Sequence, residues 1–174
     1  MDLATELYIL GLVGVAIVAY FLYFSFLFGA GYQPTPRRVV DMMLRLAEVG
    51  PRDRLYDLGA GTGGIVFRAA NVYRAQVVGV EIDPFRVLIL RLRRALGSDQ
   101  ARIAIHWGNL YDLPFSEATV VAVFLWPGAM ARLKPILEQQ LPSGARVVSH
   151  YHEVPGWTAE IYDPETKVYL YRRP

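Results

Sequence analysis

The chain has 174 residues, of which 53% are hydrophobic and 20% are charged, and its formal net charge is +2. This length supports one full-sized hydrophobic core rather than two. The absence of cysteine excludes a disulfide framework, a thiolate nucleophile and a cysteine-based zinc site. The histidines at 106, 150 and 152 are few, and His150 and His152 would point to opposite faces of a strand, so we expect no metal site. Nothing in the charge requires a nucleic-acid partner.

Residues 7–30 form a stretch of 24 residues without a charge. At about 1.5 Å per residue, a helix of this length crosses a hydrocarbon core of about 30 Å. A cleaved signal peptide has a shorter apolar region that follows basic residues, whereas Asp2 and Glu6 precede this one. A buried helix of a globular domain is disfavoured because this segment is apolar all round. The segment therefore predicts one transmembrane helix.

Arginine is concentrated on one side of this segment, because Arg37 and Arg38 follow it and no Lys or Arg precedes it. The positive-inside rule then predicts a single-pass membrane protein whose C-terminal domain lies on the cytoplasmic or an equivalent side. We expect the anchor and the start of its linker over residues 1–31 and one globular domain over residues 32–174. The linker at 29–36 is short, so its reach is at most about 25 Å.

Helical and strand patterns alternate after the linker. Thr35 is expected to cap a helix whose first residue is Pro36, and Asp83 to cap one that begins at Pro84. Apolar runs predict strands at 54–58, 76–81, 101–107, 119–126 and 145–150, with helices after the first strand to about 73, from 84 to about 96 and near 128–140, and a hairpin around 163–166. This alternation predicts a Rossmann-like, doubly wound α/β fold with a mainly parallel sheet.

The sequence YDLGAGTGG at 56–64 lies where the first strand meets the first helix, the point at which such sheets bind ligands. Its glycines satisfy the dinucleotide pattern G-x-G-x-x-G, and Glu81 follows at the distance at which an acid binds ribose hydroxyls. Asp57 distinguishes a nicotinamide dinucleotide from S-adenosylmethionine as the ligand. A pyrophosphate is anionic, so a carboxylate beside it costs free energy, whereas S-adenosylmethionine carries an ammonium and a sulfonium. The pattern therefore favours S-adenosylmethionine over a nicotinamide cofactor.

Six segments occur in the order and spacing of one family, namely TPRRVVDMML, YDLGAGTGGIVFRAA, VVGVEIDP, GNLYD, ATVVAVFLWP and LPSGARVVSH. They resemble the archaeal protein-lysine methyltransferases and the membrane-anchored mitochondrial lysine methyltransferases that modify the rotor ring of ATP synthase and the adenine nucleotide carrier. The resemblance covers nearly all of 32–157 and implies a class I, seven-stranded methyltransferase sheet with a C-terminal hairpin. Two segments depart from the family: Thr62 stands where an acid is common, and FLWPGAM replaces a variable segment at the substrate entrance.

The resemblance implies roles for residues at the carboxyl ends of the strands. Asp57 and the amides of the glycine turn would hold the methionine end of the cofactor, Glu81 the ribose and Asn109 the adenine edge. The alternatives are local: Asp57 caps the turn, Glu81 is a solvated strand end and Asn109 is a turn residue. The full set that we expect to bind the cofactor is Thr35, Asp57, Gly59, Ala60, Gly61, Thr62, Gly63, Glu81, Ile82, Asn109 and Leu110.

The fourth strand is not followed by D-P-P-Y or N-P-P-Y, which argues against amino-methylation of DNA bases. Phe124 and Trp126 instead offer an aromatic wall, and we expect these two to be the catalytic residues. Such a wall desolvates an ammonium and so favours the neutral amine of lysine, while its π-faces stabilise the developing cation. The alternative is that Phe124 belongs to the core and Trp126 anchors packing.

The sequence therefore predicts an enzyme that transfers methyl groups from S-adenosylmethionine to lysine side chains of a protein at or near a membrane. Nearly all of 32–174 is used by the core sheet, so we expect no lid to enclose a small substrate, and an open site suits a macromolecular acceptor. The first alternative is a methyltransferase that acts on a small molecule or lipid. The second is a non-enzymatic membrane adaptor, which the intact Asp57, glycines and Glu81 disfavour.

Overall fold

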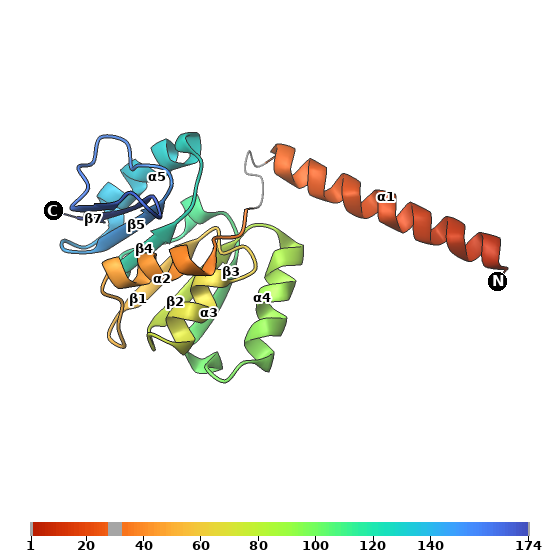
Figure 1. Cartoon of the computed structure of the whole chain (residues 1–174), viewed down its shortest axis with the longest axis horizontal. Helices are drawn as coiled ribbons and strands as arrows, with labels where there is room; N and C mark the ends of the chain where they lie inside the picture. The colour runs from red at the N-terminus through yellow and green to blue at the C-terminus, as the bar shows by residue number, and fades with distance from the viewer. Residues whose placement is uncertain (1, 28–32, 174) are drawn as a thin grey trace. The chain divides into compact units, whose positions relative to one another are not determined.

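The computed structural model describes residues 2–27 and 33–173, and it contains two compact units, residues 1–33 and 34–174. The expected domain boundary between residues 31 and 32 lies outside the described residues. The same holds for residues 28–30 of the predicted membrane segment and for most of the linker. Figure 1 shows the helix of the first unit and the α/β domain of the second.

The first unit is helix α1 (Leu3–Leu27). Its first turn is capped by Asp2, whose carboxylate accepts a hydrogen bond of 2.8 Å from the amide of Thr5. Residues Leu3–Tyr20 are long and apolar enough to cross a membrane, and none of them is buried in the structure. The length and composition of this segment are also those of a signal sequence near an N-terminus.

The second unit alternates strands and helices. Its helices are α2 (Arg37–Leu46), α3 (Gly64–Asn71), α4 (Pro84–Leu96) and α5 (Pro127–Gln140), with short 3-10 turns η1 (Gln100–Arg102) and η2 (Leu110–Asp112). Its strands are β1 (Arg54–Leu58), β2 (Gln76–Glu81), β3 (Ile103–Trp107), β4 (Val120–Val123), β5 (Arg146–His150), β6 (Ile161–Asp163) and β7 (Val168–Arg172). They form one sheet in the order β3-β2-β1-β4-β5-β7-β6, parallel from β3 to β5 and antiparallel in the C-terminal hairpin. The predicted fold class is confirmed.

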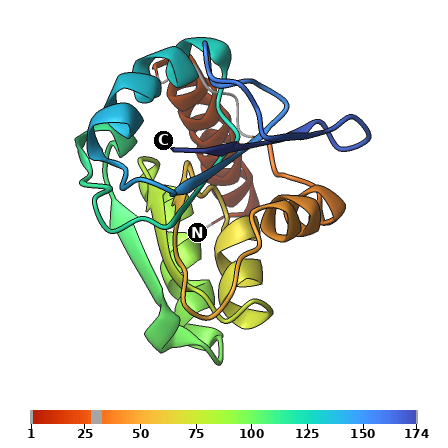
Figure 2. The same cartoon turned by 90° about the vertical axis from the view of Figure 1, so that its left-hand side faces the viewer.

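Both faces of the sheet are covered (Figure 2). Helices α2, α3 and α4 contribute Met43, Val66 and Leu90 to the core on one face, and α5 contributes Met130 and Leu133 to the core on the other. Strand β4 lies between them and is buried along its whole length. Because the faces are closed, the carboxyl ends of the parallel strands are where a ligand can approach the sheet.

One predicted helix cap is right and one is wrong. Asp83 accepts hydrogen bonds from the amides of Phe85 (2.9 Å) and Arg86 (3.2 Å), so it caps α4 as expected. Thr35 does not cap α2. Pro36 has an extended ψ of 143° and occupies the cap position itself, so the helix begins one residue later than predicted and Thr35 is outside it.

Helix α3 packs closely on strand β2 because residue 79 is a glycine. A Cβ at Gly79 would lie 2.8 Å from Cγ2 of Val66 and 3.3 Å from Cβ of Ala60. By contrast, a Cβ at Gly128 in α5 would meet no atom within 4 Å. The approach of α3 to β2 sets where the turn before α3 can lie.

Replacement of these two glycines by alanine should change the free energy of unfolding differently. We expect Gly79→Ala to lower the free energy of unfolding by about 1–3 kcal/mol, because overpacking pushes α3 from the sheet. Gly128→Ala should leave that free energy unchanged or raise it by up to about 1 kcal/mol, because alanine is the better helix former. Denaturant unfolding of both variants measures this, and equal losses in the two would contradict the close packing at Gly79.

Candidate functional site

The turn between β1 and α3 has a backbone that favours glycine. The φ angles are +86° at Gly59, +56° at Gly61 and +90° at Gly63, all in the left-handed region. The amides of Gly59 and Ala60 both donate to the carbonyl of Val80, each at 2.9 Å. The turn is therefore tied to the end of β2.

Three buried carboxylates gather where β1 and β2 end. Asp57 and Glu81 are 3% and 4% exposed, and Asp83 is fully buried. The carboxylate of Glu81 accepts hydrogen bonds from the amides of Gly61 (2.7 Å), Ile82 (3.0 Å) and Asp83 (3.0 Å). The acid predicted to bind the ribose thus also holds the glycine turn against the segment after β2.

This end of the sheet carries an excess of buried negative charge. Burial, reinforced by the nearby Glu81 and opposed by a hydrogen bond from the Val66 amide, raises the pKa of Asp57 to about 7. Arg86 compensates in part, since its guanidinium lies 3.8 Å from the Glu81 carboxylate and 3.4 Å from that of Asp83. Such a site is stabilised by a cationic ligand and disfavours an anionic one.

Four amides of the glycine turn already have acceptors within the protein, namely those of Gly59, Ala60, Gly61 and Gly63. Gly63 donates to the carbonyl of Ala60 at 2.8 Å, while Gly59 and Ala60 donate to β2 and Gly61 donates to Glu81. The role that we expected for these amides, holding the methionine end of a cofactor, stays a prediction. What the structure shows is tight packing, because a Cβ at Gly63 would lie 2.4 Å from the ring of Phe67.

The loop after β3 lies at the same end of the sheet. The amide of Gly108 donates to the carbonyl of Glu81 at 3.0 Å, which brings the next residues beside Ile82. The side-chain oxygen of Asn109 accepts from the amide two residues later at 3.2 Å, so Asn109 caps the turn η2, as the local alternative expected. Leu110 is half-buried against the core. Contact of Ile82, Asn109 and Leu110 with a cofactor stays a prediction.

Thr35 lies beside the start of α3. It lines a cavity of about 330 Å³ together with Gly64, Phe67 and Arg93, from α3 and α4. The other lining residues are Arg37, Val40, Arg68, Asn71 and Val72. This cavity adjoins the glycine turn at Gly64, and contact of Thr35 with a cofactor stays a prediction.

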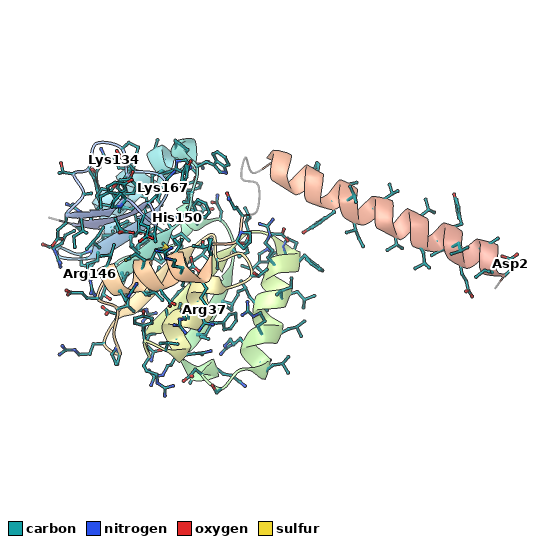
Figure 3. All side chains as sticks on the ribbon, in the orientation of Figure 1. Asp2, Arg37, Lys134, Arg146, His150 and Lys167 are labelled. Carbon is teal, nitrogen blue, oxygen red and sulfur yellow. The ribbon has the colours of Figure 1, made fainter. Side chains whose placement is uncertain are left out.

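The aromatic residues predicted at the end of β4 lie against two histidines after β5. The ring of Phe124 is 4.4 Å from that of His150, and the ring of Trp126 is 5.6 Å from that of His152, measured between centroids. Figure 3 labels His150 at the end of β5. The parallel register of β4 and β5 ends with Val123 opposite Ser149, so Phe124 and His150 are the next residues of the two segments, and Trp126 and His152 follow two residues later. Phe124 is half-buried and Trp126 is half exposed, so the wall borders solvent.

The sequence analysis did not predict that His150 and His152 lie against Phe124 and Trp126. It expected His150 and His152 on opposite faces of a strand, but β5 ends at His150 and Tyr151 has a φ of +68°, so strand geometry does not continue to His152. A parallel alignment of the two predicted strands would have placed His150 opposite Phe124 and His152 opposite Trp126, because the two pairs are separated by the same number of residues. Among the residues that the structure describes, these histidines belong to no group that could hold a metal.

The surroundings of His150 favour its neutral imidazole. Burial lowers its pKa, and the neighbouring charges of His152 and Lys167 lower it further, while backbone groups of Thr166 and Lys167 oppose the shift. Its Nδ1 is buried and has no hydrogen-bond partner within residues 2–27 and 33–173. The corner therefore combines the apolar face of Phe124 with a nitrogen that can accept a proton.

Comparison with known proteins identifies the family. The ANTKMT methyltransferase domain matches residues 57–161. The chain is 42% identical over 132 residues to a protein-lysine N-methyltransferase of Saccharolobus islandicus, a match that covers 72% of this chain and 79% of the relative. It is 32% identical over 126 residues to the mouse adenine nucleotide translocase lysine N-methyltransferase, over 72% of this chain and 55% of that relative.

A solved structure extends the match to the cofactor. The crystal structure of an RNA methyltransferase from Salinibacter ruber in complex with S-adenosyl-L-homocysteine superimposes with a TM-score of 0.79 at 42% identity. It covers 82% of this chain and 94% of that one. The predicted resemblance and the predicted cofactor are confirmed, and the cationic cofactor agrees with the acidic end of β1 and β2. The chain belongs to the ANTKMT methyltransferase family and is an S-adenosylmethionine-dependent methyltransferase.

Proposed function

We propose that this methyltransferase modifies the ε-amino group of lysine in a protein that lies at or near a membrane. The observation that carries the proposal is the corner formed by Phe124 and His150, where an aromatic face meets a neutral imidazole at the end of β4 and β5. A lysine reacts only as the neutral amine, and this corner disfavours the ammonium. Two of the relatives described above carry the name of a lysine methyltransferase, which supports the same acceptor.

The acidic end of the sheet fits the cofactor. When bound, S-adenosylmethionine supplies a methyl group on a sulfonium. We assign its positively charged methionine end to Asp57 and its ribose to Glu81, whose buried carboxylates suit an ammonium and hydroxyl donors respectively. The glycine turn with Thr62 and the residues Thr35, Ile82, Asn109 and Leu110 would complete the binding surface.

The acceptor side would work by desolvation and proton removal. The rings of Phe124 and Trp126 exclude water from the lysine side chain and so lower the pKa of its ammonium. The imidazole of His150 would accept the proton of that ammonium transiently and pass it to solvent before transfer. The lysine nitrogen then bonds to the methyl carbon as the carbon–sulfur bond breaks, and positioning of these two atoms in line supplies much of the rate.

The membrane part of the proposal rests on separate support. Helix α1 is long and apolar enough to cross a membrane, and the arginines that follow it favour the cytoplasmic or equivalent side for the methyltransferase domain. The mouse relative is named for a translocase, and further rat, mouse and human relatives are named for a component of ATP synthase. We therefore propose residues 1–31 as a single-pass anchor and 32–174 as the catalytic domain.

Mass spectrometry tests the acceptor. Membranes and RNA from host cells that lack this protein are incubated with the purified chain and isotopically labelled cofactor, with Glu81→Ala as the inactive control. We expect label on lysine residues of membrane-fraction proteins and none with the control. Label in RNA alone, the acceptor named for the Salinibacter ruber protein, would contradict the proposal while leaving the methyltransferase activity intact.

Asp57→Asn should stabilise the cofactor-free protein and weaken cofactor binding. The folded-state pKa of Asp57, about 7, is above its ordinary value of 3.8, so folding retains a proton in this window and stability falls as the pH rises from about 4 to 7. The asparagine removes this loss, so the Tm advantage of the variant should widen between pH 4.5 and pH 8. Cofactor affinity at pH 7.5 should fall about 10- to 100-fold, from the lost charged hydrogen bonds. Thermal unfolding and calorimetry measure both, and a Tm difference that is independent of pH would contradict the raised pKa.

His150→Phe separates proton transfer from packing. The phenyl ring keeps the contact with Phe124 but accepts no proton, so methyl transfer at pH 7 should fall at least about 100-fold. The deficit should shrink toward pH 10, where solution lysine is increasingly neutral. Initial rates across pH measure this, with cofactor affinity as the check of folding and His106→Phe, on the edge strand β3, as the matched control. A rate deficit that does not change with pH would reduce His150 to a packing role.

A further inference from the structure

Helix α4 turns a row of large apolar side chains outward. Leu88, Leu92 and Leu96 are 52%, 54% and 88% exposed. Their spacing places them on one side of the helix, and we refer to these three residues as the α4 apolar face. The face lies on the outer side of the domain, where Figure 1 shows α4 beyond α3.

Helix α4 differs from an ordinary surface helix because it is apolar on two sides. The opposite side of α4 already packs on the sheet through Val87 and Leu90, so the core does not account for the α4 apolar face. A surface helix in a soluble domain normally presents polar residues to solvent. A contiguous apolar row with polar edges marks a surface that contacts a protein or a membrane.

The edges of the face are basic. Helix α4 contains four arginines and no acidic residue. Arg91 flanks one side, is exposed, and forms no hydrogen bond or ion pair with the other described residues. Arg93 flanks the other side, where its guanidinium lies 4.4 Å above the ring of Phe67 and donates a hydrogen bond to the carbonyl of Thr62. Arginines beside an apolar helix face are typical of helices that lie in the headgroup region of anionic bilayers.

The chain enters the folded domain next to this helix. Thr35 and Arg37, at the start of the domain, line the same cavity as Arg93 of α4, and Figure 3 labels Arg37 on α2. The segment that precedes them contains α1, the helix long enough to cross a membrane. If α1 is embedded, the few residues between Leu27 and Pro34 keep the start of the domain within about 25 Å of the bilayer.

We propose that the α4 apolar face lies on an anionic lipid surface, with Arg91 at the level of the headgroups. A second copy of the chain is the less suitable occupant. Symmetric pairing of two α4 helices would bring arginines against arginines, and α4 has no acidic residue to pair with them. An anionic bilayer satisfies both the apolar row and its basic edges.

Spin labels on the full chain test this, because the protein has no native cysteine. Single-cysteine variants Leu92→Cys and Ile161→Cys are labelled and reconstituted into nanodiscs of phosphatidylcholine with phosphatidylglycerol. Ile161 is the matched control, since it is an exposed apolar residue on β6 at the opposite edge of the sheet from β3. We expect a water-soluble nickel chelate to collide with the Leu92 label at least about three-fold less often than with the Ile161 label. The reason is that apolar helix faces of this kind lie about 5–10 Å deep in the headgroup boundary.

The charge requirement is tested in the same discs. Each substitution is made in the Leu92→Cys background. Arg91→Gln should reduce the extra protection of the Leu92 label that phosphatidylglycerol gives over phosphatidylcholine alone. Arg52→Gln is the control, because Arg52 lies on the turn before β1, and it should leave that protection unchanged. Cofactor affinity confirms that each variant is folded.

Three outcomes would overturn the proposal: equal collision rates at Leu92 and Ile161, protection found only in discs that hold two copies, or a chain that does not enter discs of either composition. None of these readouts depends on methyl transfer, so they are separate from the test of the acceptor.

Discussion

The carboxylate of Glu81 is the interaction on which the rest of the site depends. It is buried at the end of β2 and accepts three amide hydrogen bonds, one from the glycine turn after β1 and two from the residues that lead into α4. Burial of a charge is costly unless such bonds compensate for it. Because they do, one side chain joins the two turns, and through Asp83 it also sets where α4 begins.

The site is divided electrostatically along the sheet. The end of β1 and β2 carries buried acids, whereas the end of β4 and β5 carries aromatic rings and a neutral imidazole. The first side favours a cationic methyl donor. In the function that we propose, the second side receives the neutral acceptor, and methyl transfer moves positive charge toward it, where the face of Phe124 would stabilise that charge. The order of strands in the sheet would then separate donor and acceptor chemistry.

Local signals in the sequence predicted most of the fold. The strand at 54–58, the glycine turn and the cap at Asp83 each depend on residues close together in the chain, and the structure has all three. The error at Thr35 was also local: the cap depends on the ψ angle of Pro36, which residue type does not set. The mainly parallel sheet followed from the alternation of strands and helices.

Features that arise from packing between distant segments were not predicted. His150 meets Phe124 because of the register between β4 and β5, which no short stretch of sequence contains. Helix α4 has apolar residues on two sides, and periodicity alone does not say that Val87 and Leu90 face the sheet while Leu88 and Leu92 face outward. Only the position of α4 against β2 and β3 decides that.

The raised pKa of Asp57 also bears on how the enzyme completes a turnover. If Asp57 and Glu81 hold the cofactor as we propose, its sulfonium would offset part of the repulsion between them, and methyl transfer would convert that sulfonium into an uncharged thioether. The two carboxylates would then lose part of their counter-charge without moving, so we expect the spent cofactor to be held less tightly than the one that entered. The same buried acids would favour the methyl donor on entry and the release of the product, and exchange of the cofactor would be coupled to the protonation of Asp57.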